Sequence, residues 1–156
     1  MTIAASILNT LTSAHLDYEV VAHPKSFSSV ESATFAHVPD DHFAKAVLLK
    51  DETGYLLVVI PANHWVNFHR LLEELGRDLE LAGEEEVERL FNDCAPGAVP
   101  PLGKSYGVET LLDEALTSLA HVYFEGGDHE QLIKLDAAGF KTLMQGVRHG
   151  HFSDET

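Results

Sequence analysis

Two runs of apolar residues near the middle of the chain give the clearest structural pattern in the sequence. Residues 44–50 and 55–60 are apolar at nearly every position, and Asp51-Glu52-Thr53-Gly54 separates them. This arrangement predicts a β-hairpin. Because the apolar positions are continuous and do not alternate, both strands should be covered on both faces and lie centrally in a sheet.

A second hairpin is predicted towards the C-terminus. Residues 121–125 and 130–135 are largely apolar and flank the turn Gly126-Gly127-Asp128. Shorter strands are expected over residues 18–22 and 79–81, whereas residues 107–119 fit either a strand or a helix.

Helices are predicted where capping residues precede a suitable segment. Ser28 and Glu31 have the spacing of a capping box, so a helix should begin there and continue to about Ala36. Asp136 can cap a closing helix over residues 137–144. Further helices are expected near residues 3–11, over 67–75 and over 84–91.

The order of these elements indicates the fold class. The chain has 156 residues, 45% of them hydrophobic, and has no internal repeat, linker or low-complexity stretch. We therefore expect one α/β (α+β) domain over residues 1–145, with a mixed, curved central β-sheet flanked by helices. Residues 146–156 are expected to form a loose tail.

Composition narrows the possible partners. A formal net charge of −15 weighs against DNA or RNA bound over a broad basic surface, but a polynucleotide end could still be held in one pocket. Much of the acid lies in residues 84–88, which is typical of a solvated first helical turn. The single cysteine excludes an intramolecular disulfide, and residues 1–14 suit neither a signal peptide nor a membrane span. A cytoplasmic location without a membrane partner is expected.

The segment from Asp93 to Gly103 is apolar and contains three prolines and two glycines. Proline fixes φ and lacks an N–H, whereas glycine lets the backbone approach a ligand closely. The segment is therefore either a rigid connector over the edge of the core or a binding loop whose amides face a ligand.

Three side chains are candidates for chemistry. Lys45 interrupts an otherwise apolar strand, so its ammonium should either reach a cleft or extend to the strand end. His129 directly follows a turn, where it faces a pocket or solvent. Cys94 is either a thiolate nucleophile with His129 as base or a small buried apolar residue.

Several familiar sites are missing from the sequence. His37 and His42 are five residues apart, as are His64 and His69, and neither pair has the i, i+4 spacing that places two imidazoles on one helical face. There is no Gly-x-Ser-x-Gly elbow, phosphate-binding loop or dinucleotide fingerprint. No metal or cofactor is expected, and the common hydrolases and nucleotide enzymes are disfavoured.

Four motifs in sequence order resemble the YbaK/prolyl-tRNA-synthetase-associated editing domain family. They are residues 44–49 with their hairpin, residues 96–103, Leu112-Asp113-Glu114, and residues 124–129. The resemblance covers nearly the whole chain. It implies deacylation of mischarged tRNA, either by an insertion in a prolyl-tRNA synthetase or, as a chain of this length suggests, by a free-standing trans-editing protein.

The resemblance also implies roles for individual residues. The family's motif lysine matches Lys45, its Gly-x-x-x-Pro loop matches Gly97 to Pro101, and its pocket aspartate and histidine match Asp113 and His129. The loop amides would hold the substrate carbonyl and Lys45 the phosphate or ribose of the terminal adenosine. Backbone groups and the substrate's own 2′-hydroxyl would position the attacking water.

The same loop would select the substrate by size. An apolar wall would admit a small amino acid, with proline tRNA as the expected carrier. The wall residues are Ala98, Val99, Pro100, Pro101 and Leu102.

The expected partner is the acceptor end of mischarged tRNA, with an aminoacyl-tRNA synthetase as a possible second partner and no DNA. Lys104 and Lys141 are further candidates for contacting the acceptor end. Two alternatives stay open. One is a catalytically silent module that binds a nucleotide, an aminoacyl adenosine or a synthetase, and the other is the thiol hydrolase that would use Cys94 and His129.

Overall fold

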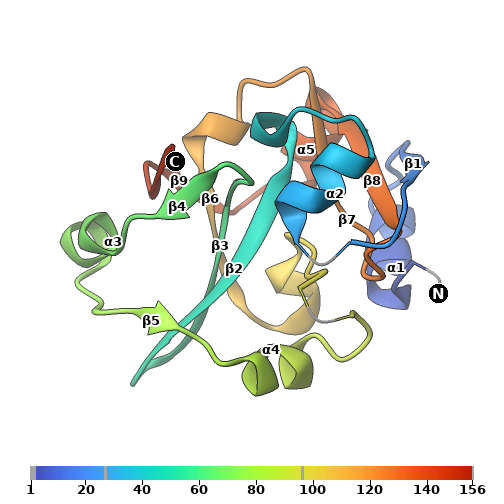
Figure 1. Cartoon of the computed structure of the whole chain (residues 1–156). Coiled ribbons are helices and arrows are strands. Elements are labelled where there is room, and N and C mark those ends of the chain that lie inside the picture. Colours follow the sequence, from blue (N-terminus) through green and yellow to red (C-terminus); the bar gives the residue numbers. More distant parts are fainter. Residues whose placement is uncertain (1–2, 27, 96, 156) are drawn as a thin grey trace.

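A mixed five-stranded sheet runs through the molecule. The computed structural model describes residues 3–26, 28–95 and 97–155 (Figure 1). The strand order is β5 (Glu80–Leu81), β2 (Ala44–Asp51), β3 (Gly54–Pro61), β6 (Glu109–Asp113) and β9 (Arg148–Gly150). The first three strands are antiparallel, whereas β3, β6 and β9 are parallel, so the expected mixed central sheet is confirmed.

The predicted central hairpin is β2 and β3, which pair along their whole length. β3 is buried from Leu56 onwards, as its continuous apolar pattern predicts. β2 is covered less completely, because β5 pairs with it only at Leu49 and Lys50. The half-buried part of β2, from Lys45 to Val47, therefore borders a surface that no described strand covers.

A smaller sheet packs against the first one. Its strand order is β1 (Glu19–Ala22), β8 (Gln131–Asp136) and β7 (His121–Glu125), and a bridge from Phe43 to Tyr123 joins it to the start of β2. The second predicted hairpin, β7 and β8, is confirmed. α1 (Ala5–Ser13) and α5 (Ala137–Leu143) enclose the main apolar core together with β3, β6 and the small sheet.

Side-chain caps begin three of the helices. Ser28 accepts from the Glu31 amide at 3.2 Å before α2 (Ser29–Phe35), and Asp136 accepts from the Gly139 amide at 2.7 Å before α5. Asn67 caps α3 (Phe68–Leu75) in the same way. α4 (Glu84–Leu90) follows β5, and 3-10 helices form over η1 (Asp40–His42), η2 (Gly103–Tyr106) and η3 (Glu114–Leu116). The ambiguous segment 107–119 thus contains β6 followed by η3.

The C-terminal residues are not a loose tail, contrary to the sequence prediction. β9 adds to the central sheet beside β6, and β10 (Ser153–Glu155) pairs with β4 (His64–Val66). Phe152 lies between them and is fully buried. The sequence pattern missed these strands because each has only three residues and its partner lies far away in the chain. The packed domain therefore extends past residue 145 to the last described residues.

The described ranges contain neither a membrane-spanning helix nor a cluster of metal-binding side chains. No helix there is long and apolar enough to cross a bilayer. Nor does any group of three or more His, Cys, Asp or Glu side chains within these ranges form a possible metal site.

Candidate functional site

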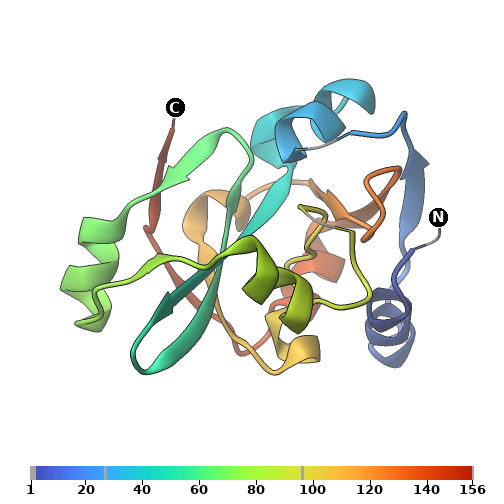
Figure 2. The ribbon, with the colours of Figure 1, turned by 60° about the horizontal axis from the view of Figure 1, so that its bottom comes forward.

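A pocket of about 560 Å³ lies beside the open part of β2 and brings together two of the predicted site segments. β2 contributes residues 45–48, and the proline-rich loop contributes Gly97 and Val99. Figure 2 shows this loop, in yellow-green, between α4 and the orange turn that joins β7 to β8. The remaining lining residues are Ser28, Leu81, Ala82, Glu84, Val87 and Glu88.

Lys45 is held in place by backbone groups of the turn after β3. Its Nζ donates to the carbonyl oxygens of Ala62 at 3.3 Å and His64 at 3.0 Å. An ammonium has three N–H donors, so these two bonds leave one for a ligand. Burial lowers the pKa of Lys45 below its ordinary value. Of the two sequence interpretations, the structure supports the one in which Lys45 reaches a cleft.

The proline-rich loop turns sharply at Gly97, whose φ is +79°. This left-handed conformation favours glycine because a Cβ there is disfavoured sterically. The Ala98 amide donates to the Ala95 carbonyl at 3.0 Å and so is used within the turn. The candidate donors to a substrate oxygen are therefore the amides of the two pocket-lining residues, Gly97 and Val99.

The beginning of this loop is fixed from several sides. The Ala95 amide donates to the Gly127 carbonyl at 2.7 Å, which attaches the loop to the β7–β8 turn. The Asp93 carboxylate accepts from the Ser6 amide at 3.0 Å and from the Tyr106 hydroxyl at 2.6 Å. Burial opposes ionisation of Asp93, but these hydrogen bonds outweigh it and lower its pKa to about 2. These hydrogen bonds attach the start of the loop to α1, to η2 and to the β7–β8 turn.

The five predicted wall residues do not share one cavity. Val99 lines the pocket with Lys45, whereas Ala98 and Pro100 are buried in the protein. Pro101 and Leu102 line a separate groove of about 740 Å³ between α1, η2 and α5, together with Lys104. Neighbouring residues of this loop thus face different surfaces, which the sequence pattern could not show.

His129 lies in a buried polar cluster and does not line the pocket. It is 4% exposed, and its φ is +60°. Its Nδ1 lies 3.8 Å from Oε1 of Glu125, which also accepts a short hydrogen bond from the Ser32 hydroxyl. Ser26 bonds to Ser32 at 2.5 Å and extends the cluster. His129 thus belongs to the same β7–β8 turn as Gly127, whose carbonyl binds the loop.

Asp113 is likewise outside the pocket lining. This carboxylate is 2% exposed and accepts from the Phe152 amide at 2.9 Å and the Ser153 hydroxyl at 2.7 Å. Ser153 in turn lies 2.8 Å from Nδ1 of His64, the residue whose carbonyl binds Lys45. Asp113 therefore anchors the C-terminal strands and reaches Lys45 only through these intermediates.

The environment of Cys94 opposes a thiolate mechanism. Burial raises the pKa of its thiol to about 12, and the neighbouring Asp93 carboxylate adds to this effect although the Tyr106 hydroxyl opposes it. Its sulfur lies 3.4 Å from both the Asp93 carboxylate and the Tyr106 hydroxyl. A thiol of this pKa is almost entirely protonated near neutral pH.

Sequence reasoning missed two features of this region. Glu84 and Glu88 are one helical turn apart on α4 and line the pocket, although the acidic run was expected to be only a solvated turn. Trp65 lies beside Lys45, with Nζ 5.9 Å from the ring centroid. No local pattern indicated this contact, because it depends on how β4 follows β3.

Sequence comparisons relate this chain to translation proteins. A model of the aminoacyl-tRNA editing domain family matches residues 23–143. Proline–tRNA ligases of Bacillus cereus (strain G9842) and Bacillus anthracis (strain A0248) are 28% identical to it over 109 residues, or 69% of the chain. The chain spans 19% of the length of these ligases.

Solved structures with the same fold include two that match along almost their whole length. One is described as a candidate trans-editing enzyme for prolyl-tRNA synthetase; it has a TM-score of 0.80 at 24% identity and covers 96% of this chain and 95% of its own. The other, a hypothetical protein, has a TM-score of 0.83 at 22% identity and covers 96% and 99%. At these identities the likeness concerns the fold.

Proposed function

The chain belongs to the aminoacyl-tRNA editing domain family, and from this premise we propose that it is an aminoacyl-tRNA deacylase. It hydrolyses the ester that joins a small amino acid to the 3′ end of a mischarged tRNA, with proline tRNA as the expected carrier. The observation that carries this proposal is the shared pocket of Lys45, Gly97 and Val99. Action as a separate protein in trans is supported by the fold shared with a candidate trans-editing enzyme along nearly all of both chains.

The proposed chemistry needs no nucleophilic side chain, because an aminoacyl-tRNA is already an activated ester. As water attacks, the carbonyl oxygen gains negative charge and accepts hydrogen bonds from the amides of Gly97 and Val99. Such donors stabilise the transition state more than the ground state, and loss of one costs roughly 100-fold in rate. Backbone groups and the 2′-hydroxyl of the substrate orient the water in this scheme.

Lys45 binds the terminal nucleotide in this proposal. Its remaining N–H donates to the phosphate or ribose, and its two carbonyl partners keep the ammonium at the pocket. Removing a hydrogen bond to a charged group costs about 1.5–3 kcal/mol, or roughly 10- to 100-fold in affinity or rate. The single fixed cation thus orients the ester towards the loop amides.

The pocket walls suit the aminoacyl group. Val47, Val87 and Val99 provide apolar surface, whereas Glu84 and Glu88 place negative charge near the opening. An aminoacyl ester carries a positively charged α-ammonium, which favours a position near those carboxylates. The same charges repel phosphates, so the tRNA should approach from the Lys45 side.

A panel of mischarged tRNAs tests the proposal. Alanyl-, cysteinyl-, seryl- and threonyl-tRNA are incubated with the wild type and with Lys45→Ala, and the remaining ester is measured over time. We expect the wild type to hydrolyse at least one member and Lys45→Ala to be roughly 10- to 100-fold slower. If no member of the panel is hydrolysed, the deacylase proposal is refuted, and the alternative of a catalytically silent binding module remains.

A further inference from the structure

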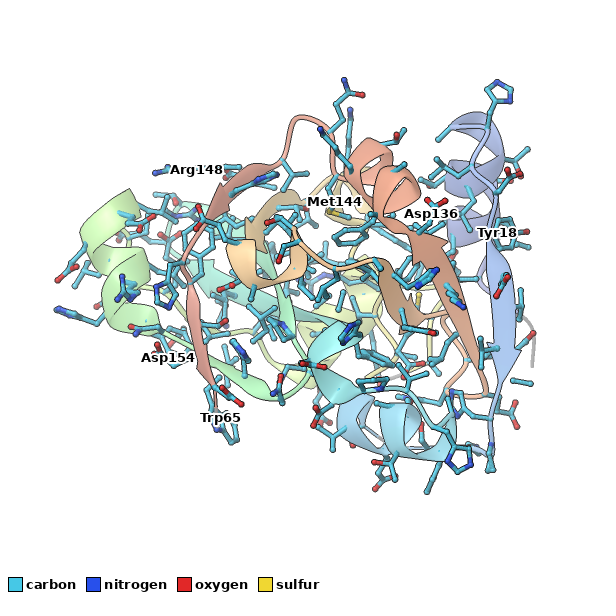
Figure 3. The ribbon with its side chains drawn as sticks, turned by 90° about the horizontal axis from the view of Figure 1, so that it is seen from above. Tyr18, Trp65, Asp136, Met144, Arg148 and Asp154 are labelled. Atoms are coloured by element: carbon cyan, nitrogen blue, oxygen red, sulfur yellow. The ribbon has the colours of Figure 1, made fainter. Side chains whose placement is uncertain are left out.

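Trp65 is an exposed aromatic residue that the packing of the protein does not explain. It is the only tryptophan of the chain and is 69% exposed, the most exposed of the large apolar residues described. Figure 3 shows its ring projecting outward from the ribbon near Asp154. A large indole left in water favours a binding role over a structural one.

The backbone that carries Trp65 is nevertheless well fixed. β4 pairs with β10, with Trp65 opposite Asp154. The Asn67 side-chain amide donates to the Asp154 carboxylate at 2.7 Å, and His64 Nδ1 lies 2.8 Å from the Ser153 hydroxyl. These contacts on both sides of Trp65 hold the backbone under the ring without burying it.

Trp65 is also joined to the pocket through Lys45. The ammonium lies 5.9 Å from the ring centroid and donates to the carbonyl of His64, the residue directly before Trp65. The same Lys45 lines the pocket with Gly97 and Val99. A cation and an exposed aromatic face therefore lie side by side at the edge of the pocket.

We propose that Trp65 is the stacking platform for the base of the terminal adenosine of tRNA. This inference rests on the proposed function, because the ester to be cleaved is attached to the ribose of that nucleotide. With the ester at the loop amides and the phosphate or ribose at Lys45, the base of the same nucleotide lies within reach of the neighbouring ring. Unpaired bases stack on exposed aromatic side chains, and such contacts strengthen binding roughly 10- to 100-fold per base.

The charge of the protein supports a stacking contact. With a net charge of −15, the chain offers little general attraction for phosphate. Stacking does not require basic residues, since every base has an aromatic face. Trp65 therefore gives an acidic protein a means to hold a nucleotide that one lysine alone would hold weakly.

Fluorescence of the single tryptophan tests this directly. The RNA trinucleotide CCA is titrated into the wild-type protein, with a trinucleotide whose last residue lacks a base as the control ligand. We expect CCA to quench the fluorescence of Trp65 saturably and the abasic control not to quench it. Trp65→Phe should abolish the tryptophan fluorescence, because Trp65 is the single tryptophan. Equal quenching by both ligands would overturn the proposal.

Kinetics provide the second measurement and separate this inference from the proposed function. On the substrate found in the tRNA panel, Trp65→Ala should raise KM roughly 10- to 100-fold with kcat nearly unchanged, and Trp65→Phe should restore most of the loss. An unchanged KM in Trp65→Ala together with no CCA quenching refutes the stacking but leaves the deacylase intact. If no tRNA is hydrolysed, CCA quenching still decides the stacking by itself.

Discussion

Two lysines on the same strand, Lys45 and Lys50, differ in what their ammonium groups contact. Lys50 forms an ion pair with Glu86 at 2.6 Å, whereas Lys45 contacts backbone carbonyls and borders the pocket. The sequence left open whether Lys45 reaches a cleft or extends to the strand end, although a lysine among apolar residues needs a special environment. It could not predict the neighbouring Trp65, which approaches Lys45 only after the chain turns from β3 into β4.

The lowered pKa of Lys45 predicts a dependence of ligand binding on pH. Affinity for CCA requires the charged ammonium, so it should fall as pH rises through a pKa below the ordinary lysine value of about 10.4. Burial disfavours the charged form of Lys45 in the folded state. The free energy of unfolding should therefore not fall as pH rises from the lowered pKa of Lys45 to the ordinary lysine pKa of the unfolded chain. CCA titrations from pH 7 to 10 should show the loss in the wild type, with stability retained. Constant affinity up to pH 10 contradicts the prediction, and Lys45→Arg, which stays charged, is the control.

Gly127 supports the proline-rich loop, and its replacement should disturb that loop. Its φ is +99°, and a Cβ added there would lie 2.8 Å from the Cβ of Ala4. Gly127→Ala should cost about 1–3 kcal/mol in the free energy of unfolding and also lower kcat, because the Gly127 carbonyl binds Ala95. Gly146→Ala is the matched control, since Gly146 has φ +84° and no atom within 4 Å of an added Cβ. Urea unfolding that shows equal losses in both variants would mean that the clash is unimportant.

At the level of elements, the well-predicted parts are those with strong local patterns. The two hairpins and the helix caps at Ser28 and Asp136 follow from periodicity and capping chemistry, and all are confirmed. β9 and β10 were missed because short strands are defined by their partners and not by their own sequence. The site was predicted only in part, because it too depends on contacts between distant segments. Family motifs identified the loop, but not which of its residues face which cavity.

Asp113 should be more important for stability than for chemistry. Asp113→Ala removes the acceptor for the Phe152 amide and the Ser153 hydroxyl, which should cost about 1–3 kcal/mol. Phe152→Ala, which empties a fully buried site outside the pocket lining, should cost about 3–5 kcal/mol. Urea unfolding and deacylation are measured on the same samples below the unfolding transition. An Asp113→Ala protein with wild-type stability and no activity would instead support the catalytic role that the family resemblance implied.

For the whole molecule, the main tension is between its acidity and a tRNA substrate. A net charge of −15 opposes broad electrostatic attraction, and for this reason the proposed recognition is confined to the acceptor end. In the proposed complex, Lys45, the exposed Trp65 ring and the amides of Gly97 and Val99 would provide these local contacts. A synthetase or another partner would then supply the remaining affinity in the cell.

Salt dependence measures how many phosphates the protein contacts. Neutralising one or two phosphates of a single strand gives a slope of about −0.7 to −1.4 when log affinity is plotted against log salt concentration. We expect the isolated protein to bind tRNA weakly, with a slope in this range. Equilibrium binding measured between 50 and 200 mM salt gives this slope. Nanomolar binding whose affinity does not change with salt concentration would contradict recognition through one or two phosphates.

The most direct test of the central claim compares single-turnover deacylation by matched lysine variants. Lys134 is the control, because its Nζ also lies over an aromatic ring, 5.7 Å from the Tyr123 centroid, but it does not line the pocket. On the best substrate of the panel, Lys45→Ala should be roughly 10- to 100-fold slower than the wild type, whereas Lys134→Ala and Cys94→Ala should remain close to it. Full activity of the Lys45→Ala variant would contradict the proposed site. Loss of activity in Cys94→Ala while Lys45→Ala stays active would contradict it as well and would favour a thiol mechanism.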